Sequence, residues 1–186
     1  MYLLLGVILV FAAIVALLYN RLIRDRNRVD AAWSDIDVQL QRRHDLVPQL
    51  VEAVDQYAKY ERATLEAVTT LRAEAMQTGA EVAKRGEVEE QLSDGLRRLI
   101  AVAESYPDLK ANENFLNLQN ELVETEDYLQ FARRFYNGSV RQLNTRIGTV
   151  PNNVVAGWFG FTERDYFQKR SDEVANVPLV DLGQVE

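Results

Sequence analysis

The chain begins with an uncharged apolar segment, MYLLLGVILVFAAIVALLYN, before apolar and polar positions settle into a helical pattern. Between Tyr2 and Tyr19 an α-helix would be about 27 Å long, close to the roughly 30 Å hydrocarbon core of a membrane. The two tyrosines would lie at the interfaces, where aromatic side chains gather. The pattern predicts a transmembrane anchor over residues 1–20, formed by Tyr2, Leu3, Leu4, Leu5, Val7, Ile8, Leu9, Val10, Phe11, Ile14, Val15, Leu17, Leu18 and Tyr19.

A cleaved signal peptide is the alternative interpretation of this segment. Signal peptides have a basic residue before a shorter apolar region and small residues at the cleavage site. Here no Lys or Arg precedes the apolar run, and the run ends in Leu-Leu-Tyr-Asn-Arg. We therefore expect the segment to be retained as an anchor.

A basic collar, consisting of Arg21, Arg24, Arg26 and Arg28, follows the anchor with only Asp25 among it. Positive residues mark the cytoplasmic side of a span, so we expect a single-pass inner-membrane protein whose N-terminus is outside and whose remaining chain is cytoplasmic. A second interpretation is that these arginines extend toward the surface or bind lipid headgroups.

The first helix of the remaining chain continues from the anchor, because no helix breaker stands between Asn20 and Val29. Apolar residues then recur at Val29, Trp33, Ile36 and Leu40, the spacing of one helix face. Asp45 is a good N-cap residue and Pro48 fits a first helical turn. These residues predict that the helix ends at 43–45 in a tight hairpin. One kinked helix is the alternative, because the apolar period resumes at residue 47.

Three further helices are predicted, at about 46–77, 81–105 and 108–147. Gly79 is expected to end the first, Pro107 to interrupt the chain after the second, and Gly148 and Pro151 to end the third. The inward positions of the first two are Val54, Tyr57, Ala58, Leu65, Val68, Leu71, Ala75, Leu92, Leu96, Leu99, Ile100 and Val102. Those of the last are Phe115, Leu118, Leu122, Thr125, Leu129, Ala132, Tyr136, Val140 and Leu143.

This pattern contains no strand-like alternation and predicts an all-α fold. The transmembrane helix would run into an antiparallel four-helix bundle over residues 21–150. A short aromatic C-terminal tail over residues 151–186 would follow, with its last part, 171–186, loosely ordered. In the tail, Trp158, Phe159 and Phe161 either close one end of the bundle or form an interfacial patch that contacts lipid or a protein partner.

Composition excludes several classes of function. The 186 residues include no cysteine and one histidine, which rules out disulfides, thiolate catalysis and cysteine-bound metals. The net charge of -7 argues against general nucleic-acid binding. Residues 21–43 hold six basic and four acidic side chains, whereas residues 44–186 hold fifteen and twenty-four. A basic membrane-proximal segment beneath an acidic bundle would hold the lower end of the bundle near anionic headgroups.

Acidic side chains are frequent on the last long helix, at Glu113, Glu121, Glu124, Glu126 and Asp127. A di-iron bundle also needs Glu-x-x-His motifs, and His44 has glutamine three residues before it. We expect a solvated acidic face, a surface or capping role for His44, and no catalytic, metal or cofactor site. Amides on the same helix either meet a partner or join helices, at Asn112, Asn114, Asn117, Gln119 and Asn120.

Three long segments resemble the bacterial LemA family: YNRLIRDRNRVDAAWSDIDVQLQRRHDLVPQLVEAVDQYAKYE (19–61), YPDLKANENFLNLQNELVETED (106–127) and ARRFYNGSVRQLNTRI (132–147). The resemblance covers nearly the whole chain. It implies a single-pass membrane protein with a helical-bundle domain and no established reaction. The family includes relatives associated with magnetosome membranes, which implies a role in membrane organisation.

The sequence thus favours a membrane-anchored interaction or scaffold protein without catalysis. Its expected partners are membrane lipid and an unidentified protein or a second copy of itself, and not nucleic acid. The main alternative is an accessory subunit of a membrane-bound enzyme such as a protease. A hydrolase would require a carboxylate pair in a pocket.

Overall fold

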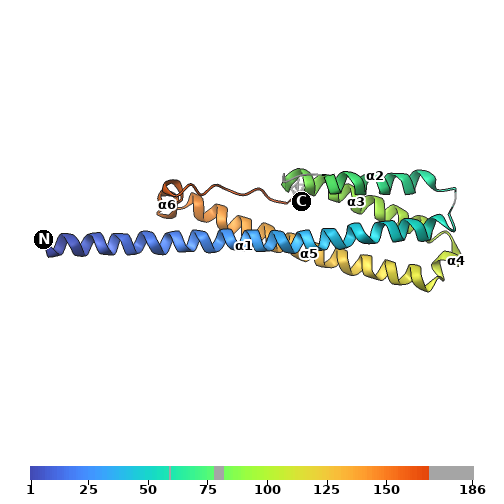
Figure 1. The fold of residues 1–186 in the computed structure, drawn as a ribbon, viewed down its shortest axis with the longest axis horizontal. Helices are drawn as coiled ribbons and strands as arrows, with labels where there is room; N and C mark the ends of the chain where they lie inside the picture. Colours follow the sequence, from blue (N-terminus) through green and yellow to red (C-terminus); the bar gives the residue numbers. More distant parts are fainter. Residues whose placement is uncertain (59, 78–81, 168–186) are drawn as a thin grey trace, which may run out of the picture.

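The computed structural model describes residues 1–58, 60–77 and 82–167, and all of its regular structure there is helical (Figure 1). The described part of the chain forms six helices in this order: α1 (Tyr2–Asp55), α2 (Arg62–Gln77), α3 (Val82–Ala103), α4 (Pro107–Lys110), α5 (Glu113–Gly148) and α6 (Asn152–Trp158). The predicted stop at Gly79 and the predicted loose segment 171–186 lie outside the described residues. The all-α prediction is confirmed.

Helix α1 is 54 residues long and continues from the apolar N-terminal segment into the helical core (Figure 1). An 18-residue window within it has a mean hydropathy of 2.8 and no buried residue, so the helix is long and apolar enough to cross a membrane. The expected continuation of the anchor into the next helix is confirmed.

The predicted hairpin at residues 43–45 is wrong, because α1 passes through Pro48 to Asp55. Pro48 lies on the exposed side of the helix, away from the buried positions. The buried positions Leu40, Val47, Leu50 and Val54 keep the helical spacing across the proline. Their burial stabilises the helix on both sides, which offsets the usual cost of an interior proline.

The chain reverses after Asp55 and α2 begins at Arg62, so the predicted helix over 46–77 is wrong in its start. Nothing in this stretch is a glycine or proline, and Ala58 is buried within the turn, its amide bonded to the Val54 carbonyl at 2.8 Å. Tyr57, expected to point inward, is exposed.

The later boundaries agree better with expectation. α3 ends at Ala103, and Tyr106 has extended backbone (φ -114°, ψ 98°) ahead of Pro107, as expected of a residue before proline. The predicted helix over 108–147 is divided into α4 and α5. Asn112 starts α5 as its N-cap, because its side chain accepts from the amides of Asn114 and Phe115 at 2.9 and 3.1 Å. All nine inward positions predicted for this helix are buried.

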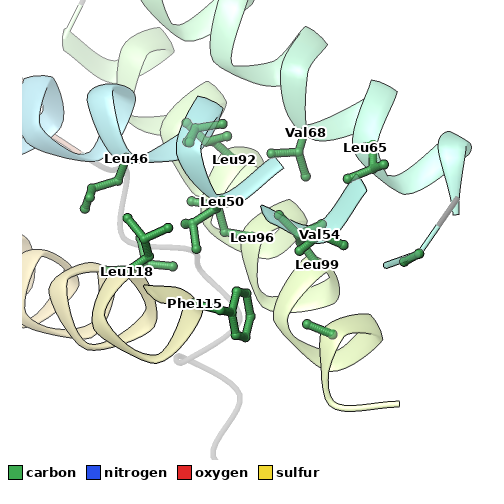
Figure 2. Packing of buried hydrophobic residues seen from close by; sticks show 14 of the residues in the cluster. Leu46, Leu50, Val54, Leu65, Val68, Leu92, Leu96, Leu99, Phe115 and Leu118 are labelled. Carbon is green, nitrogen blue, oxygen red and sulfur yellow. The ribbon is translucent and has the colours of Figure 1, made fainter. Parts of the chain in front are cut away.

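Two of the three buried apolar clusters among the described residues follow one another between α1 and α5. The distal core joins the end of α1 to α2, α3 and the start of α5, and Figure 2 shows Leu50, Val54, Leu96, Leu99 and Phe115 converging there. The middle core, around Ile36, Leu40, Leu129 and Val140, joins α1 to the second half of α5. Each fully buried large side chain contributes about 1.5–3 kcal/mol.

Candidate functional site

A layer of charged side chains separates the distal core from the middle core. We call it the buried ionic layer: Arg43 and His44 of α1, Glu89 and Ser93 of α3, and Glu126 of α5. The Arg43 guanidinium forms an ion pair with Glu89, donates to Ser93 Oγ at 2.5 Å and donates to Glu126 Oε1 at 2.7 Å. His44 Nε2 lies 3.0 Å from Glu89 Oε1. One arginine therefore links three helices.

The electrostatics of the layer favour an ionised Glu89. Burial raises the pKa of this carboxyl group, but the contacts with His44 and the charge of Arg43 outweigh burial and hold the pKa below its ordinary value of 4.5. Neither Arg43 nor Glu89 has any exposed surface. A buried charge is tolerated when it is paired and hydrogen-bonded, and here the two charges satisfy each other.

Arg133 of α5 borders the layer. Its Nη1 lies 3.4 Å from Glu90 Oε2, and its guanidinium lies 4.9 Å from the centre of the Phe167 ring. Burial and the nearby charge of Arg43 lower the pKa of Arg133. This second arginine brings the layer into contact with the C-terminal tail.

The prediction that His44 is a surface or capping residue is wrong, because only 3% of the residue is exposed. Glu126 also departs from the predicted solvated acidic face, since it is half-buried and pairs with Arg43. The other four members of that face are exposed, at Glu113, Glu121, Glu124 and Asp127. The available signal was spacing, because residues 43 and 44 stand three and four positions after Leu40, on its face of the helix.

The tail packs against α1 where the apolar segment ends, near α6 in Figure 1. Val155 and Ala156 are buried with Leu22. The Tyr19 ring lies 4.7 Å from Phe159 and 5.8 Å from Phe161, centre to centre. This part of the tail covers one end of the helical core.

Other aromatic side chains of the tail remain exposed. Trp158 is 62% exposed and Phe159 is 53% exposed, while Phe161 is half-buried. The contact of Phe159 with Tyr19 places both exposed side chains beside the end of the apolar segment. The geometry therefore fits both interpretations of the tail. The packing of α6 closes one end of the helical core, and the exposed Trp158 and Phe159 are free to contact lipid or a protein partner.

Residues 162–167 are fixed along α5 by polar side chains. The Tyr136 hydroxyl donates to the Asp165 carbonyl at 2.9 Å, and burial raises the pKa of Tyr136 to about 12. The Asn144 side chain donates to the Arg164 carbonyl and accepts from its amide, both at 2.9 Å. Phe167, with no exposed surface, then packs in the middle core. The side-chain amide of Asn144 was not among the amides predicted to make contacts.

The basic collar faces several directions. Arg21 and Arg24 are exposed, Arg26 lies 5.6 Å from the centre of the Phe161 ring, and Arg28 lies 5.1 Å from that of Phe135. Asp25, within the collar, is buried. The anchor residues ahead of the collar are exposed except for three half-buried ones, Val15, Leu18 and Tyr19.

The side of α5 turned away from the core carries large apolar side chains. We call it the outer face of α5, formed by Leu116, Val123, Tyr128, Phe131 and Phe135. Phe131 is 66% exposed and Val123 is 55% exposed. The neighbouring positions 122 and 129 are buried. The outer face of α5 therefore carries large exposed apolar side chains among exposed charged ones such as Glu124 and Asp127.

Comparison with known proteins places the chain in a family. A model of the LemA family matches residues 32–182. The magnetosome proteins MamQ 1 and MamQ 2 of Paramagnetospirillum magneticum are each 27% identical, over 88% of this chain and 69% of the relative. Protein LemA of Metamycoplasma hominis is 27% identical, over 88% of this chain and 74% of that protein. The chain belongs to the LemA family.

Proposed function

We propose that this chain is a membrane-anchored interaction or scaffold protein without catalytic activity of its own, whose outer face of α5 binds a protein partner. The carrying observation is the exposure of five large apolar side chains on that face. Large apolar side chains that gather on one exposed side of a helix often belong to a contact surface. The face extends over 20 residues, about 29 Å of helix.

Because the anchor confines the chain to the membrane, a weak contact through the outer face of α5 is sufficient for association with a partner. Because α1 runs from the apolar segment into both apolar clusters, the outer face of α5 stays at a fixed height above the membrane. We infer that α1, α2, α3 and α5 form an antiparallel four-helix bundle. Confinement to one membrane raises the effective concentration of such bundles. The relatives named as magnetosome proteins support a role in membrane or envelope organisation.

The absence of catalysis is supported by the buried ionic layer. Its carboxylate Glu89 and its arginine Arg43 have no exposed surface, so a substrate does not reach either group. Its other carboxylate, Glu126, is half-buried and paired with Arg43. General acid–base catalysis needs a group within hydrogen-bond reach of its substrate. The layer is instead placed to join α1, α3 and α5.

Cysteine cross-linking tests the outer face. The chain has no cysteine, so Val123→Cys introduces a single thiol on that face. We expect oxidation of membranes with copper phenanthroline to produce a disulfide-linked dimer of Val123→Cys. Thr70→Cys, exposed on α2, is the matched control and is expected to stay monomeric. Equal cross-linking of both variants, or of neither, would contradict self-association through α5.

A photo-cross-linking residue at position 131 separates the scaffold from the accessory-subunit alternative. Adducts with a second copy of the chain favour the scaffold. Stoichiometric adducts with one membrane-bound enzyme, such as a protease, favour an accessory subunit. Binding of either partner, a second copy or an enzyme, is expected to weaken in Phe131→Glu. The new carboxylate would be buried at the interface without a cationic partner.

We further propose that the N-terminus is outside and that the helices beyond the anchor are cytoplasmic. The exposed arginines 21 and 24 at the end of the apolar segment support this orientation. In intact cells we expect Thr70→Cys to resist a membrane-impermeant maleimide and to react after permeabilisation. Labelling before permeabilisation would reverse the orientation and direct the search for partners to the envelope.

A further inference from the structure

A shallow cleft opens where α5 meets α1 just beyond the apolar segment. Arg21 of α1 borders it on one side, and Arg141, Arg146 and Thr145 of α5 border it on the other. Gly138 also lines the cleft, and a Cβ added there would have no atom within 4 Å. The cleft therefore combines three guanidinium groups with open space.

The charge of the cleft is only partly neutralised. Arg146 Nε lies 2.8 Å from Asp25 Oδ2, and Gln142 donates to the other oxygen of Asp25 at 3.0 Å. Within the described part of the chain, Arg21 and Arg141 form no ion pair or hydrogen bond. Two exposed guanidinium groups thus border one cleft with no acidic partner among the described residues.

The membrane-proximal end of the cleft lies at the depth of the headgroup layer. Arg21 follows Tyr19 by two residues, about 3 Å along the helix, and Asp25 follows it by six, about 9 Å. The headgroup region on each side of the hydrocarbon core is roughly 5–7 Å thick. If Tyr19 lies at the boundary of the hydrocarbon, Arg21 is within this layer, and the Asp25–Arg146 pair lies about 2–4 Å beyond its outer edge. From there the cleft extends away from the membrane to Arg141.

We propose that this cleft binds the phosphate group of an anionic phospholipid headgroup. Guanidinium groups match phosphate oxygens in geometry as well as in charge. The exposed Trp158 and Phe159 stand at the same end of the molecule, where interfacial aromatics belong. The assignment rests on the proposed membrane anchor and adds to it a defined site on the bundle.

Native mass spectrometry of the full chain, released from detergent micelles, measures the binding. The probes are dioleoyl phosphatidylglycerol, dioleoyl phosphatidylcholine and inorganic phosphate. We expect phosphatidylglycerol to bind more tightly than the other two. Arg141→Glu changes the charge of the cleft by two units. At about 1 kcal/mol per unit of charge, phosphatidylglycerol binding is expected to weaken about 25-fold.

The matched control is Arg134→Glu. It makes the same change on the same helix, about 10 Å farther along, at an exposed arginine outside the cleft. We expect less than a twofold change. Equal losses in the two variants would indicate general surface attraction and overturn the site. Gly138→Glu places a carboxylate in the cleft and is expected to weaken binding about fivefold, whereas Gly138→Ala leaves it unchanged.

Other results would also overturn the proposal. Equal affinity for phosphatidylcholine would remove the preference for an anionic lipid, and equal affinity for inorganic phosphate would indicate a soluble phosphate ligand. The membrane fraction of cells is measured in parallel for each variant. A variant that loses lipid binding yet stays in the membrane fraction separates this site from the anchor, and a wild-type chain found outside that fraction would refute the anchor itself.

Discussion

Replacing Arg43 with methionine will lower the free energy of unfolding by about 3–5 kcal/mol, the usual cost of removing one partner of a buried ion pair. The substitution keeps a long side chain but leaves the Glu89 carboxyl group, which has no exposed surface, without its arginine partner. Ser93 and Glu126 lose their donor as well. Circular dichroism of the full chain in detergent is expected to show a melting temperature lower by about 6–20 °C.

Two further variants separate charge from packing. Arg97→Met removes an exposed arginine that pairs with Asp94 and Glu90, and we expect a change below about 0.5 kcal/mol. The double variant Arg43→Met, Glu89→Met removes both buried charges. We expect it to be more stable than Arg43→Met alone, because no fully buried carboxylate is left unpaired and Glu126, which also loses Arg43, is half-buried. A double variant as unstable as the sum of the single ones would mean that the pair is not coupled.

The same layer gives stability a defined pH dependence. The pKa of Glu89 is lower in the folded chain than its ordinary value of 4.5, so folding favours the ionised group. Its contribution is complete above about pH 4.5 and is lost as the pH falls through the lower folded-state pKa. The melting temperatures of the wild type and Glu89→Gln are expected to differ at pH 7 and to converge on acidification. A constant difference would mean that Glu89 is not ionised.

Periodicity predicted the buried face of α5, and most of the inward positions predicted for the other helices are buried. The stripe on α5 from Phe115 to Leu143 is wholly buried, because a long amphipathic helix has only one way to cover its apolar side. The same spacing extends through Arg43 and His44, but Asp45 and Pro48 favoured a turn as the interpretation. Charged residues become acceptable at such positions only with partners, and Glu89 stands more than 40 residues away.

Turns were harder to predict than faces. Pro48 and Asp45 are residues typical of a helix start, yet the chain turns at 56–61, where it contains neither glycine nor proline. The attachment of the tail was also beyond local reasoning. It depends on Asn137, which accepts from the Phe167 amide at 3.0 Å, and on Asn144, so its partners are 20–30 residues apart. A local pattern describes one helix, whereas these contacts depend on the packing of several.

Arg72 and Pro48 are expected to be energetically coupled through a backbone carbonyl. Proline has no N–H to donate to the residue four positions earlier, which leaves the His44 carbonyl without its usual helical donor. Arg72 Nε of α2 donates to this oxygen at 2.7 Å. Arg72→Met is expected to cost about 1.5–3 kcal/mol, because a charge-assisted hydrogen bond is lost and the carbonyl remains without a donor.

Pro48→Ala supplies the missing N–H and is expected to stabilise the chain by about 1–3 kcal/mol. In that background Arg72→Met is expected to cost at least about 1 kcal/mol less than in the wild type, because the new backbone N–H then serves the same carbonyl. Melting of the four chains in detergent measures the cycle, with Arg98→Met, at an exposed arginine of α3, as the control. Additive effects, within about 0.5 kcal/mol, would show that the two donors do not compete for the His44 carbonyl. The expected coupling would instead mean that the proline which interrupts the hydrogen bonds of α1 also provides its attachment point for α2.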